Sequence, residues 1–157
     1  MAQETRVAYG EKLAELIVKN PNIVVLDADL TKSTKTIEAK KACPERQVTA
    51  LCGDGSLQMQ FMELATAVQH DIDIKLIVFV NNMLGMVREL QDRVYEREIA
   101  VDLTGSPRFD IIAEAYGIKA ENITDISQAE TAIENMLASE KPYLLQVFVD
   151  REERTII

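Results

Sequence analysis

Two hydrophobic patterns alternate along this chain. In some stretches apolar side chains recur every three to four residues, and in others nearly every position is apolar. The first pattern is typical of helices that bury one face, and the second is typical of buried strands. The helical stretches are residues 5–19, 33–42, 57–69, 86–95, 107–116 and 127–138. The strand-like stretches are residues 23–26, 48–52, 76–80 and 143–149, and residues 119–123 complete the set although they include poor strand formers.

This alternation predicts an α/β fold of three layers, with a doubly wound, mainly parallel sheet of about five strands between helices. Residues 76–80 have no polar alternation, which predicts a central strand buried on both faces. Ligands of such sheets bind where the strands end at their carboxyl side. The polar residues at these ends are Asp27, Asp29, the segment 53–56, Asn81 and Asn82.

Two later helices carry their own start and stop signals. Ser106 is a suitable N-cap, with Pro107 at the first helical position and Gly117 just past the end. Ser127 and Glu130 have the spacing of a capping box for the helix that follows. We therefore expect these helices to begin at Pro107 and directly after Ser127.

Composition limits the kinds of partner. The chain has 157 residues, of which 47% are hydrophobic and 27% charged, so we expect one globular domain over residues 1–157. The net charge of -9, with basic residues scattered among acidic ones, predicts that nucleic acid is not a ligand. Cys43 and Cys52 lack metal or redox spacing, and no apolar run is long enough to cross a membrane. These features predict a cytoplasmic protein without a membrane partner.

The segment Gly53-Asp54-Gly55-Ser56 carries the clearest chemistry. Glycines on both sides of Asp54 allow positive φ and a close approach of the backbone to a ligand. A helix starting near Leu57 would direct unpaired N–H groups at that ligand, which favours a diphosphate. Mg²⁺ between the diphosphate and Asp54 would remove their repulsion, with an asparagine oxygen and a backbone carbonyl as further ligands.

Each of these residues also has a simpler interpretation. Asp54 suits a solvated turn, and either Asn81 or Asn82 can form an Asx turn without any metal. Asp27 and Asp29 are best interpreted as loop residues, and His70 as a helix-terminal residue without a catalytic role. The charged residues of the helix at 86–95 fit an exposed face; they are Arg88, Glu89, Asp92 and Arg93.

Gly53-Asp54-Gly55 followed by an apolar strand and Asn81-Asn82 resembles the signature of thiamine diphosphate-dependent enzymes. Further motifs make residues 48–153 similar to the diphosphate-binding domain of acetolactate synthases; they are 53–59, 63–68, 84–88 and 113–117. The resemblance implies a thiamine diphosphate-binding fold, with Mg²⁺ and thiamine diphosphate as cofactors. The cofactor-binding residues it implies are Gly53, Asp54, Gly55, Ser56, Asn81, Met83, Leu84, Gly85 and Met86.

The same resemblance implies the metal ligands. The family's offset from the aspartate leads to Asn81, with the Met83 carbonyl as the third ligand beside Asp54. A gap in the alignment would give the role to Asn82. We prefer Asn81, because the ungapped alignment also keeps Leu84-Gly85-Met86 in place.

The first part of the chain resembles a different family. Residues 5–46 are similar to the start of the pyrimidine-binding domain of transketolases, on the segments 5–11, 22–30 and 33–36. This combination predicts an engineered hybrid of a transketolase-like segment, 1–47, and an acetolactate synthase-like segment, 48–157.

Several family features have no counterpart in this sequence. No catalytic glutamate can be assigned, and Leu90 occupies the position of a tryptophan that shapes the keto-acid pocket. The resemblance therefore implies a hybrid that carries the Mg²⁺ and thiamine diphosphate motif without complete catalytic activity on its own. Two alternatives stay open: a structural hybrid with no ligand, and half of a two-chain carboligase. The sequence also leaves a homo-oligomer open.

Overall fold

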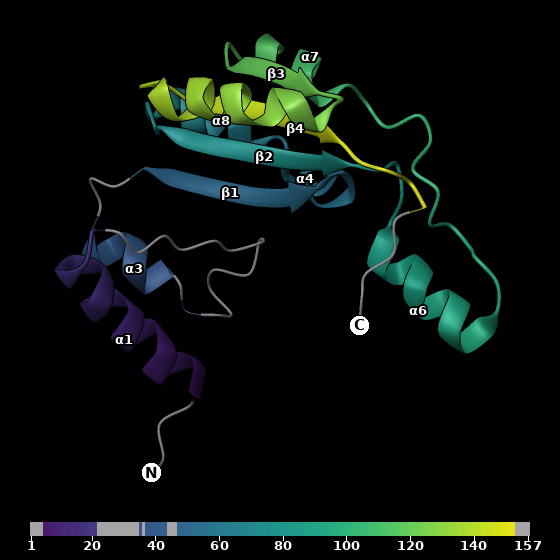
Figure 1. Ribbon diagram of the computed structural model, residues 1–157, viewed down its shortest axis with the longest axis horizontal. Coiled ribbons are helices and arrows are strands. Elements are labelled where there is room, and N and C mark those ends of the chain that lie inside the picture. Colours follow the sequence, from purple (N-terminus) through teal and green to yellow (C-terminus); the bar gives the residue numbers. More distant parts are fainter. Residues whose placement is uncertain (1–4, 22–34, 36, 44–46, 153–157) are drawn as a thin grey trace. The chain divides into compact units, whose positions relative to one another are not determined.

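The computed structural model describes residues 5–21, 35, 37–43 and 47–152 (Figure 1). The chain divides into two compact units, Met1–Leu51 and Cys52–Ile157. The strand expected at 23–26, Asp27 and Asp29 lie outside the described residues, as does the start of the helix expected at 33–42.

The first unit contains helices α1 (Thr5–Lys19) and α3 (Ile37–Ala42). Their apolar faces meet in a small cluster, which consists of Ile17, Ala39 and Cys43 with Leu13 packed against it. A Cβ atom at Gly10 would lie 2.6 Å from the backbone oxygen of Lys35, so glycine is needed for this close approach. The bounds of α1 confirm the helix that the sequence predicts at residues 5–19.

The sheet has four described strands: β1 (Val48–Gly53), β2 (Ile74–Val80), β3 (Lys119–Ile123) and β4 (Tyr143–Phe148). Their order is β1-β2-β4-β3, and β4 runs parallel to both β2 and β3. The register pairs Lys75 with Tyr143 and Val80 with Phe148. The predicted α/β fold with a parallel sheet is confirmed.

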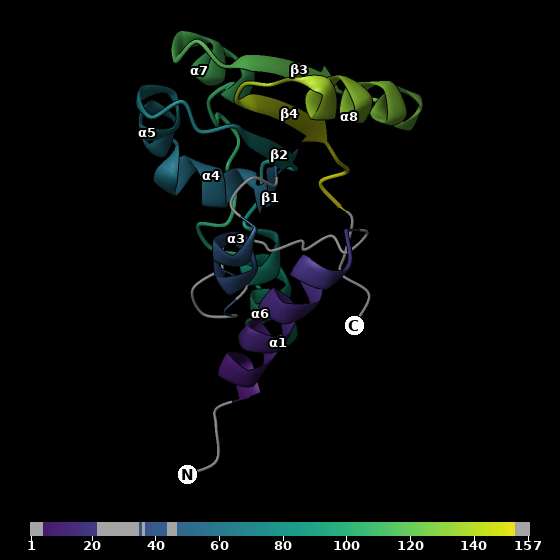
Figure 2. The same ribbon diagram turned by 90° about the vertical axis from the view of Figure 1, so that its left-hand side faces the viewer.

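Helices cover both faces of the sheet in the second unit. α4 (Asp54–Gln60), α5 (Glu63–Gln69) and α7 (Phe109–Ala115) lie on one side, and α8 (Ala129–Ala138) lies on the other (Figure 2). α6 (Gly85–Tyr95) lies beyond the carboxyl ends of the strands (Figure 1). This arrangement gives the three predicted layers and leaves the carboxyl edge of the sheet to loops and α6.

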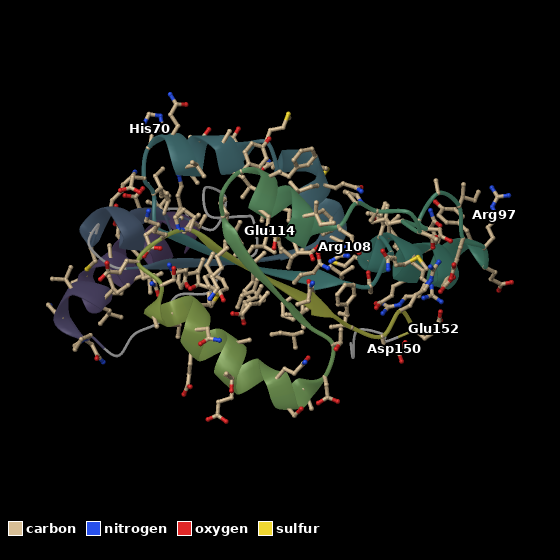
Figure 3. All side chains as sticks on the ribbon, turned by 90° about the horizontal axis from the view of Figure 1, so that it is seen from above. His70, Arg97, Arg108, Glu114, Asp150 and Glu152 are labelled. Carbon is tan, nitrogen blue, oxygen red and sulfur yellow. The ribbon has the colours of Figure 1, made fainter. Side chains whose placement is uncertain are left out.

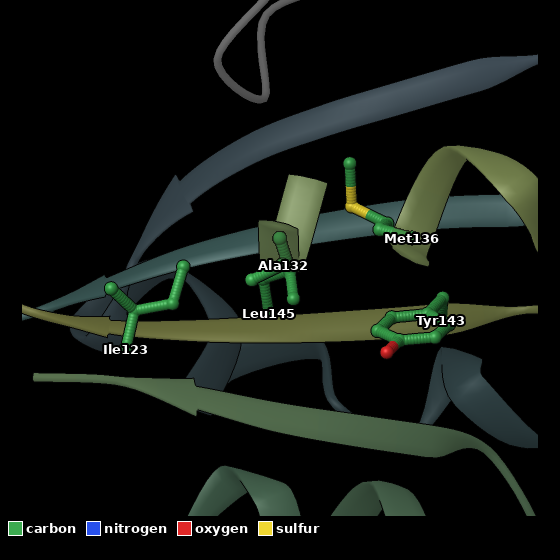
Figure 4. Packing of buried hydrophobic residues seen from close by; sticks show 5 residues of the cluster. All are labelled: Ile123, Ala132, Met136, Tyr143 and Leu145. Atoms are coloured by element: carbon green, nitrogen blue, oxygen red, sulfur yellow. The ribbon is translucent and has the colours of Figure 1, made fainter. Parts of the chain in front are cut away.

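The main apolar cluster lies between α8 and strands β3 and β4 (Figure 4). It consists of Ile123, Ala132, Met136, Tyr143 and Leu145, with Ile77 and Val147 packed against it. On β4 the alternate residues Leu144 and Gln146 are buried as well. β4 is thus the strand that is buried on both faces over most of its length.

That burial was expected for residues 76–80, and for β2 the expectation is only partly correct. Leu76, Val78 and Val80 are buried, whereas Phe79 is 42% exposed. Phe79 and Ile77 line a surface cavity next to α8. The apolar run therefore identified a strand inside the sheet, but one face of it stays open near its carboxyl end.

Three helix limits differ from the prediction. α7 begins at Phe109 and not at Pro107, because the side-chain oxygen of Gln146 accepts hydrogen bonds from Phe109 N (3.0 Å) and Asp110 N (3.3 Å).

The capping box is formed by Asp125 with Gln128, and not by Ser127 with Glu130, so a 3-10 turn (Ile126–Gln128) precedes α8. The helix expected at 57–69 is divided into α4 and α5. Gly117 has φ 78°, as expected for a residue past a helix end.

Candidate functional site

The predicted site residues lie along one edge of the sheet. Gly53 ends β1, and α4 follows at once, with Asp54, Gly55 and Ser56 in its first turn. The end of β2 leads into α6. The connection contains Asn81, Met83 and Leu84, and α6 begins with Gly85 and Met86. Met86 is 83% exposed, whereas Met83 is buried.

Asp54 joins the carboxyl ends of β1 and β2. Its carboxylate oxygen Oδ2 accepts a hydrogen bond from the backbone N–H of Asn82 at 2.7 Å, and Oδ1 accepts one from Gly55 N at 2.8 Å. The residue is only 2% exposed. Asp54 is therefore a buried, hydrogen-bonded residue and not the solvated turn residue of the simpler interpretation. The expected meeting of the two strand ends is confirmed.

Asn81 folds its side chain back over the connection. Its Oδ1 atom accepts a hydrogen bond from Met83 N at 3.0 Å, which is the Asx turn that the simpler interpretation predicted. A Cβ atom at Gly85 would lie 3.5 Å from Asn81 Nδ2, so the amide also contacts the start of α6. Asn82 has a positive φ of 54°, a conformation that asparagine tolerates better than most residues.

A second segment fixes the connection after β2. Residues 82–84 pair with residues 101–103 in an antiparallel bridge between Met83 and Asp102. Leu84 N donates to Val101 O at 2.8 Å, and Leu103 N donates to Asn82 O at 3.0 Å. The backbone is thereby hydrogen-bonded both before and after Met83, one of the predicted metal ligands.

The glycines act differently from the prediction. Gly53 has φ -85°, and the only described glycines with positive φ are Gly105 and Gly117. A Cβ atom at Gly55 would lie 2.6 Å from Leu84 Cδ2 and 3.4 Å from Leu103 Cδ1. Gly55 thus allows Leu84 to pack closely against it, and a side chain here would displace the end of Leu84. The strand can turn directly into a helix without positive φ, because Asp54 is already the first helical residue.

Arg88 connects α6 to the segment that follows β4. The residue is 8% exposed, so its predicted place on an exposed helix face is wrong. Its guanidinium donates to Glu98 and Glu152, each at 2.6 Å, and to the carbonyl of Arg151 at 3.0 Å. Glu152 and Glu98 raise the pKa of Arg88, so the group stays charged.

Asp110 is a second buried carboxylate near this edge. It accepts hydrogen bonds from the guanidinium of Arg108 and from Asn122 Nδ2, the latter at 2.8 Å. The hydrogen bonds from Arg108 lower the pKa of Asp110 to about 2, although burial opposes this shift. Neither Asp110 nor Gln146 is among the site residues predicted from the sequence. A glutamine within the otherwise apolar strand 143–148 was the one available signal.

The lowered pKa of Asp110 predicts a loss of stability in acid. An unfolded aspartate has a pKa of about 3.9, so the ionised folded form contributes stability that is present above about pH 4 and lost as the pH falls towards 2. We expect Asp110→Asn to reduce the loss of unfolding free energy between about pH 5 and pH 2 by about 1–2 kcal/mol. Urea unfolding of both proteins across this range measures the difference, and parallel pH curves would contradict the prediction.

Other candidate groups lie elsewhere. His70 is the C-cap of α5, and Figure 3 shows it well separated from Arg108.

Among the described residues no three His, Cys, Asp or Glu side chains are grouped to hold a metal ion. None of the described helices has the length and hydrophobicity to span a membrane.

Comparison with known proteins identifies the family. Residues 35–147 match the family described as thiamine pyrophosphate enzyme, C-terminal TPP binding domain. The chain belongs to this family. Thiamine pyrophosphate is another name for thiamine diphosphate, so the resemblance of the sequence to thiamine diphosphate-dependent enzymes is confirmed at the level of the family.

Acetolactate synthases are among the relatives of this family member. The chain is 38% identical over 118 residues to acetolactate synthase isozyme 2 large subunit of Escherichia coli, covering 74% of this chain and 22% of that protein. It is 37% identical over 118 residues to a probable acetolactate synthase large subunit of Methanocaldococcus jannaschii, covering 74% and 20%. The chain thus spans about a fifth of the length of these relatives.

A solved structure shows the same fold. The thiamine diphosphate-dependent 4-hydroxybenzoylformate decarboxylase of Rhodococcus jostii RHA1 superposes with a TM-score of 0.71 over 92% of this chain and 33% of the other, at 22% identity. The family match begins at residue 35, inside the segment 5–46 that was compared with transketolases. The comparisons do not support the transketolase resemblance or a hybrid origin, and both stay predictions from the sequence.

Proposed function

We propose that this chain binds the diphosphate of thiamine diphosphate through Mg²⁺ at the carboxyl ends of β1 and β2. The observation that carries the proposal is the hydrogen bond from Asn82 N to Asp54 Oδ2 at 2.7 Å. It holds the carboxylate next to the connection that contains Asn81 and Met83. Membership of the family supports the identity of the cofactor.

Three oxygen donors fit the metal. Asp54 supplies a carboxylate whose two oxygens each accept one N–H and retain further lone pairs. Asn81 supplies its amide oxygen, which likewise has a lone pair beyond the one that accepts from Met83 N, and Met83 supplies its backbone carbonyl. Mg²⁺ prefers such oxygen ligands and completes its octahedron with phosphate oxygens and water.

Asn81 suits this role better than Asn82. The backbone N–H of Asn82 already contacts Asp54, while Asn82 lines a different cavity together with Arg108 and Gln146. The side chain of Asn81 instead lies over Met83 and Gly85 at the start of α6. We therefore assign the amide ligand to Asn81. The remaining residues proposed to flank the diphosphate are Gly53, Gly55, Ser56, Leu84, Gly85 and Met86.

The proposed role is binding and orientation of the cofactor. When bound, thiamine diphosphate supplies the ylid chemistry of its thiazolium ring. Asp54, Asn81 and Met83 hold the metal, and the paired segments 82–84 and 101–103 keep these ligands in place. Because the chain spans about a fifth of its curated relatives and no catalytic residue is assigned, we propose no complete reaction for the chain alone.

Calorimetry tests the proposal. We expect saturable heat when thiamine diphosphate is added in the presence of Mg²⁺, and none when Mg²⁺ is replaced by excess chelator, since the diphosphate and Asp54 would repel each other without the cation. Thiamine without the diphosphate is the matched control and should give no saturable heat. Absence of heat at millimolar thiamine diphosphate with Mg²⁺ would favour the alternative of a structural domain without ligand.

A further inference from the structure

A second cavity lies beside the proposed cofactor site, where β2, β3 and β4 end. It has a volume of about 410 Å³. Six polar residues line it: Asn82, Ser106, Arg108, Asn122, Thr124 and Gln146. Val80, Pro107 and Phe148 supply the apolar part of the lining. This cavity contains no residue of the proposed cofactor site, and the two are adjacent at Asn82, whose backbone N–H contacts Asp54.

Gln146 gives the cavity a buried hydrogen-bond donor. The residue is 2% exposed, and its side-chain oxygen accepts from both Phe109 N and Asp110 N. These two donors fix the orientation of the amide, because an amide nitrogen cannot accept a hydrogen bond. The nitrogen atom therefore points away from α7.

The amide nitrogen of Gln146 is the polar atom of this side chain that stays available to a ligand in the cavity. Within the described part of the chain it has no hydrogen-bond partner, and no side-chain nitrogen or oxygen that is shielded from solvent lacks one. The nitrogen must therefore reach solvent, and Gln146 meets solvent space in this cavity. A donor in such a buried residue is best satisfied by an acceptor that enters the cavity.

The lining offers an anion one charged hydrogen-bond donor. Arg108 is the charged residue of the lining, and no carboxylate is part of it. The guanidinium uses Nε and Nη2 to bind Asp110, which leaves Nη1 for another acceptor. Asp110 itself is engaged by Arg108 and Asn122 and does not line the cavity.

We propose that this cavity binds a small carboxylate that carries an apolar group. The carboxylate oxygens accept hydrogen bonds from the Gln146 amide nitrogen and from Arg108, and the apolar group packs on Phe148 and Val80. Phe148 is 42% exposed, so an apolar ligand would remove part of this ring from water. The site is independent of the proposed thiamine diphosphate site.

Nuclear magnetic resonance of the ¹⁵N-labelled chain tests this site. Butyrate is the probe, and butyramide, which has the same shape without the charge, is the matched control. We expect butyrate to shift the Gln146 side-chain amide and the backbone amides of Phe109 and Asp110 in a saturable way, with butyramide bound about 10-fold more weakly. Equal shifts by both compounds, or no saturable shift, would overturn the proposal.

Two variants separate ligand binding from folding. Gln146→Glu keeps an oxygen acceptor for Phe109 N and Asp110 N but removes the donor and adds a repelling charge. Arg108→Gln removes the charge from an exposed side chain together with its ion pair to Asp110, and leaves both hydrogen bonds that Gln146 accepts at the start of α7. We expect each variant to bind butyrate about 10-fold more weakly than the wild-type chain. If Gln146→Glu does not fold, Arg108→Gln alone decides, and wild-type affinity in a folded variant contradicts the proposal.

Discussion

Replacing Asp54 with alanine is expected to weaken the binding of thiamine diphosphate with Mg²⁺ by about 100-fold or more. Loss of a residue that only orients a metal ligand costs about 10–100-fold in affinity, and a direct ligand should cost at least as much. The proposed Asp54 carboxylate is the one charged protein ligand, so its loss also leaves the metal less well neutralised. Calorimetry at a fixed Mg²⁺ concentration measures the change.

The structural role of Asp54 has to be measured separately. Alanine leaves Gly55 N and Asn82 N without their acceptor, and an unsatisfied buried donor costs about 1–3 kcal/mol. Thermal unfolding without ligand reports this cost for Asp54→Ala and for Asp54→Asn, which keeps one oxygen acceptor. Asp71→Asn is the matched control, because it makes the same charge change at an exposed position.

The two interpretations of Asp54 predict different results. If it binds the metal, thiamine diphosphate with Mg²⁺ raises the unfolding temperature of the wild-type chain and of Asp71→Asn, but not that of Asp54→Ala. If its only role is the bond to Asn82, the ligand changes the unfolding temperature of Asp54→Ala as it changes that of the wild-type chain, by a common rise or not at all. The second result would contradict the proposed function.

Replacing Lys75 with methionine is expected to lower the free energy of unfolding by about 2–3 kcal/mol. The Lys75 side chain is fully buried at the start of β2 and makes an ion pair with Asp73. Its Nζ atom also donates to the carbonyls of Ser139 and Lys141, at 2.7 and 2.6 Å. Methionine fills similar space but leaves both carbonyls and Asp73 without this donor.

Urea unfolding measures the effect of Lys75→Met. Lys141→Met is the matched control, since this exposed lysine lies on the same connection between α8 and β4 and its side chain should contribute less than about 0.5 kcal/mol. Equal stability of the two variants would show that the buried ammonium is not needed to hold this connection.

The sequence by itself determined the order and type of the elements that the structure describes. The reason is that hydrophobic periodicity is a local property, which each segment carries whatever its neighbours are. β3 has the predicted bounds of 119–123, and α6 begins one residue before the predicted helix. Parallel strands place their carboxyl ends at one edge, so the pattern also brought Asp54 close to the end of β2, as the bond to Asn82 confirms.

Only the tertiary structure decided where α7 begins, which strand is buried on both faces, and how the polar residues at the sheet edge are paired. Gln146 takes the capping role expected for Ser106, and Arg88 is buried by Glu98 and Glu152. Lys75 is held by carbonyls of the connection between α8 and β4. These contacts join residues distant in the sequence, and hydrogen-bond satisfaction in a buried environment depends on which groups the fold brings together. No local pattern carries that information.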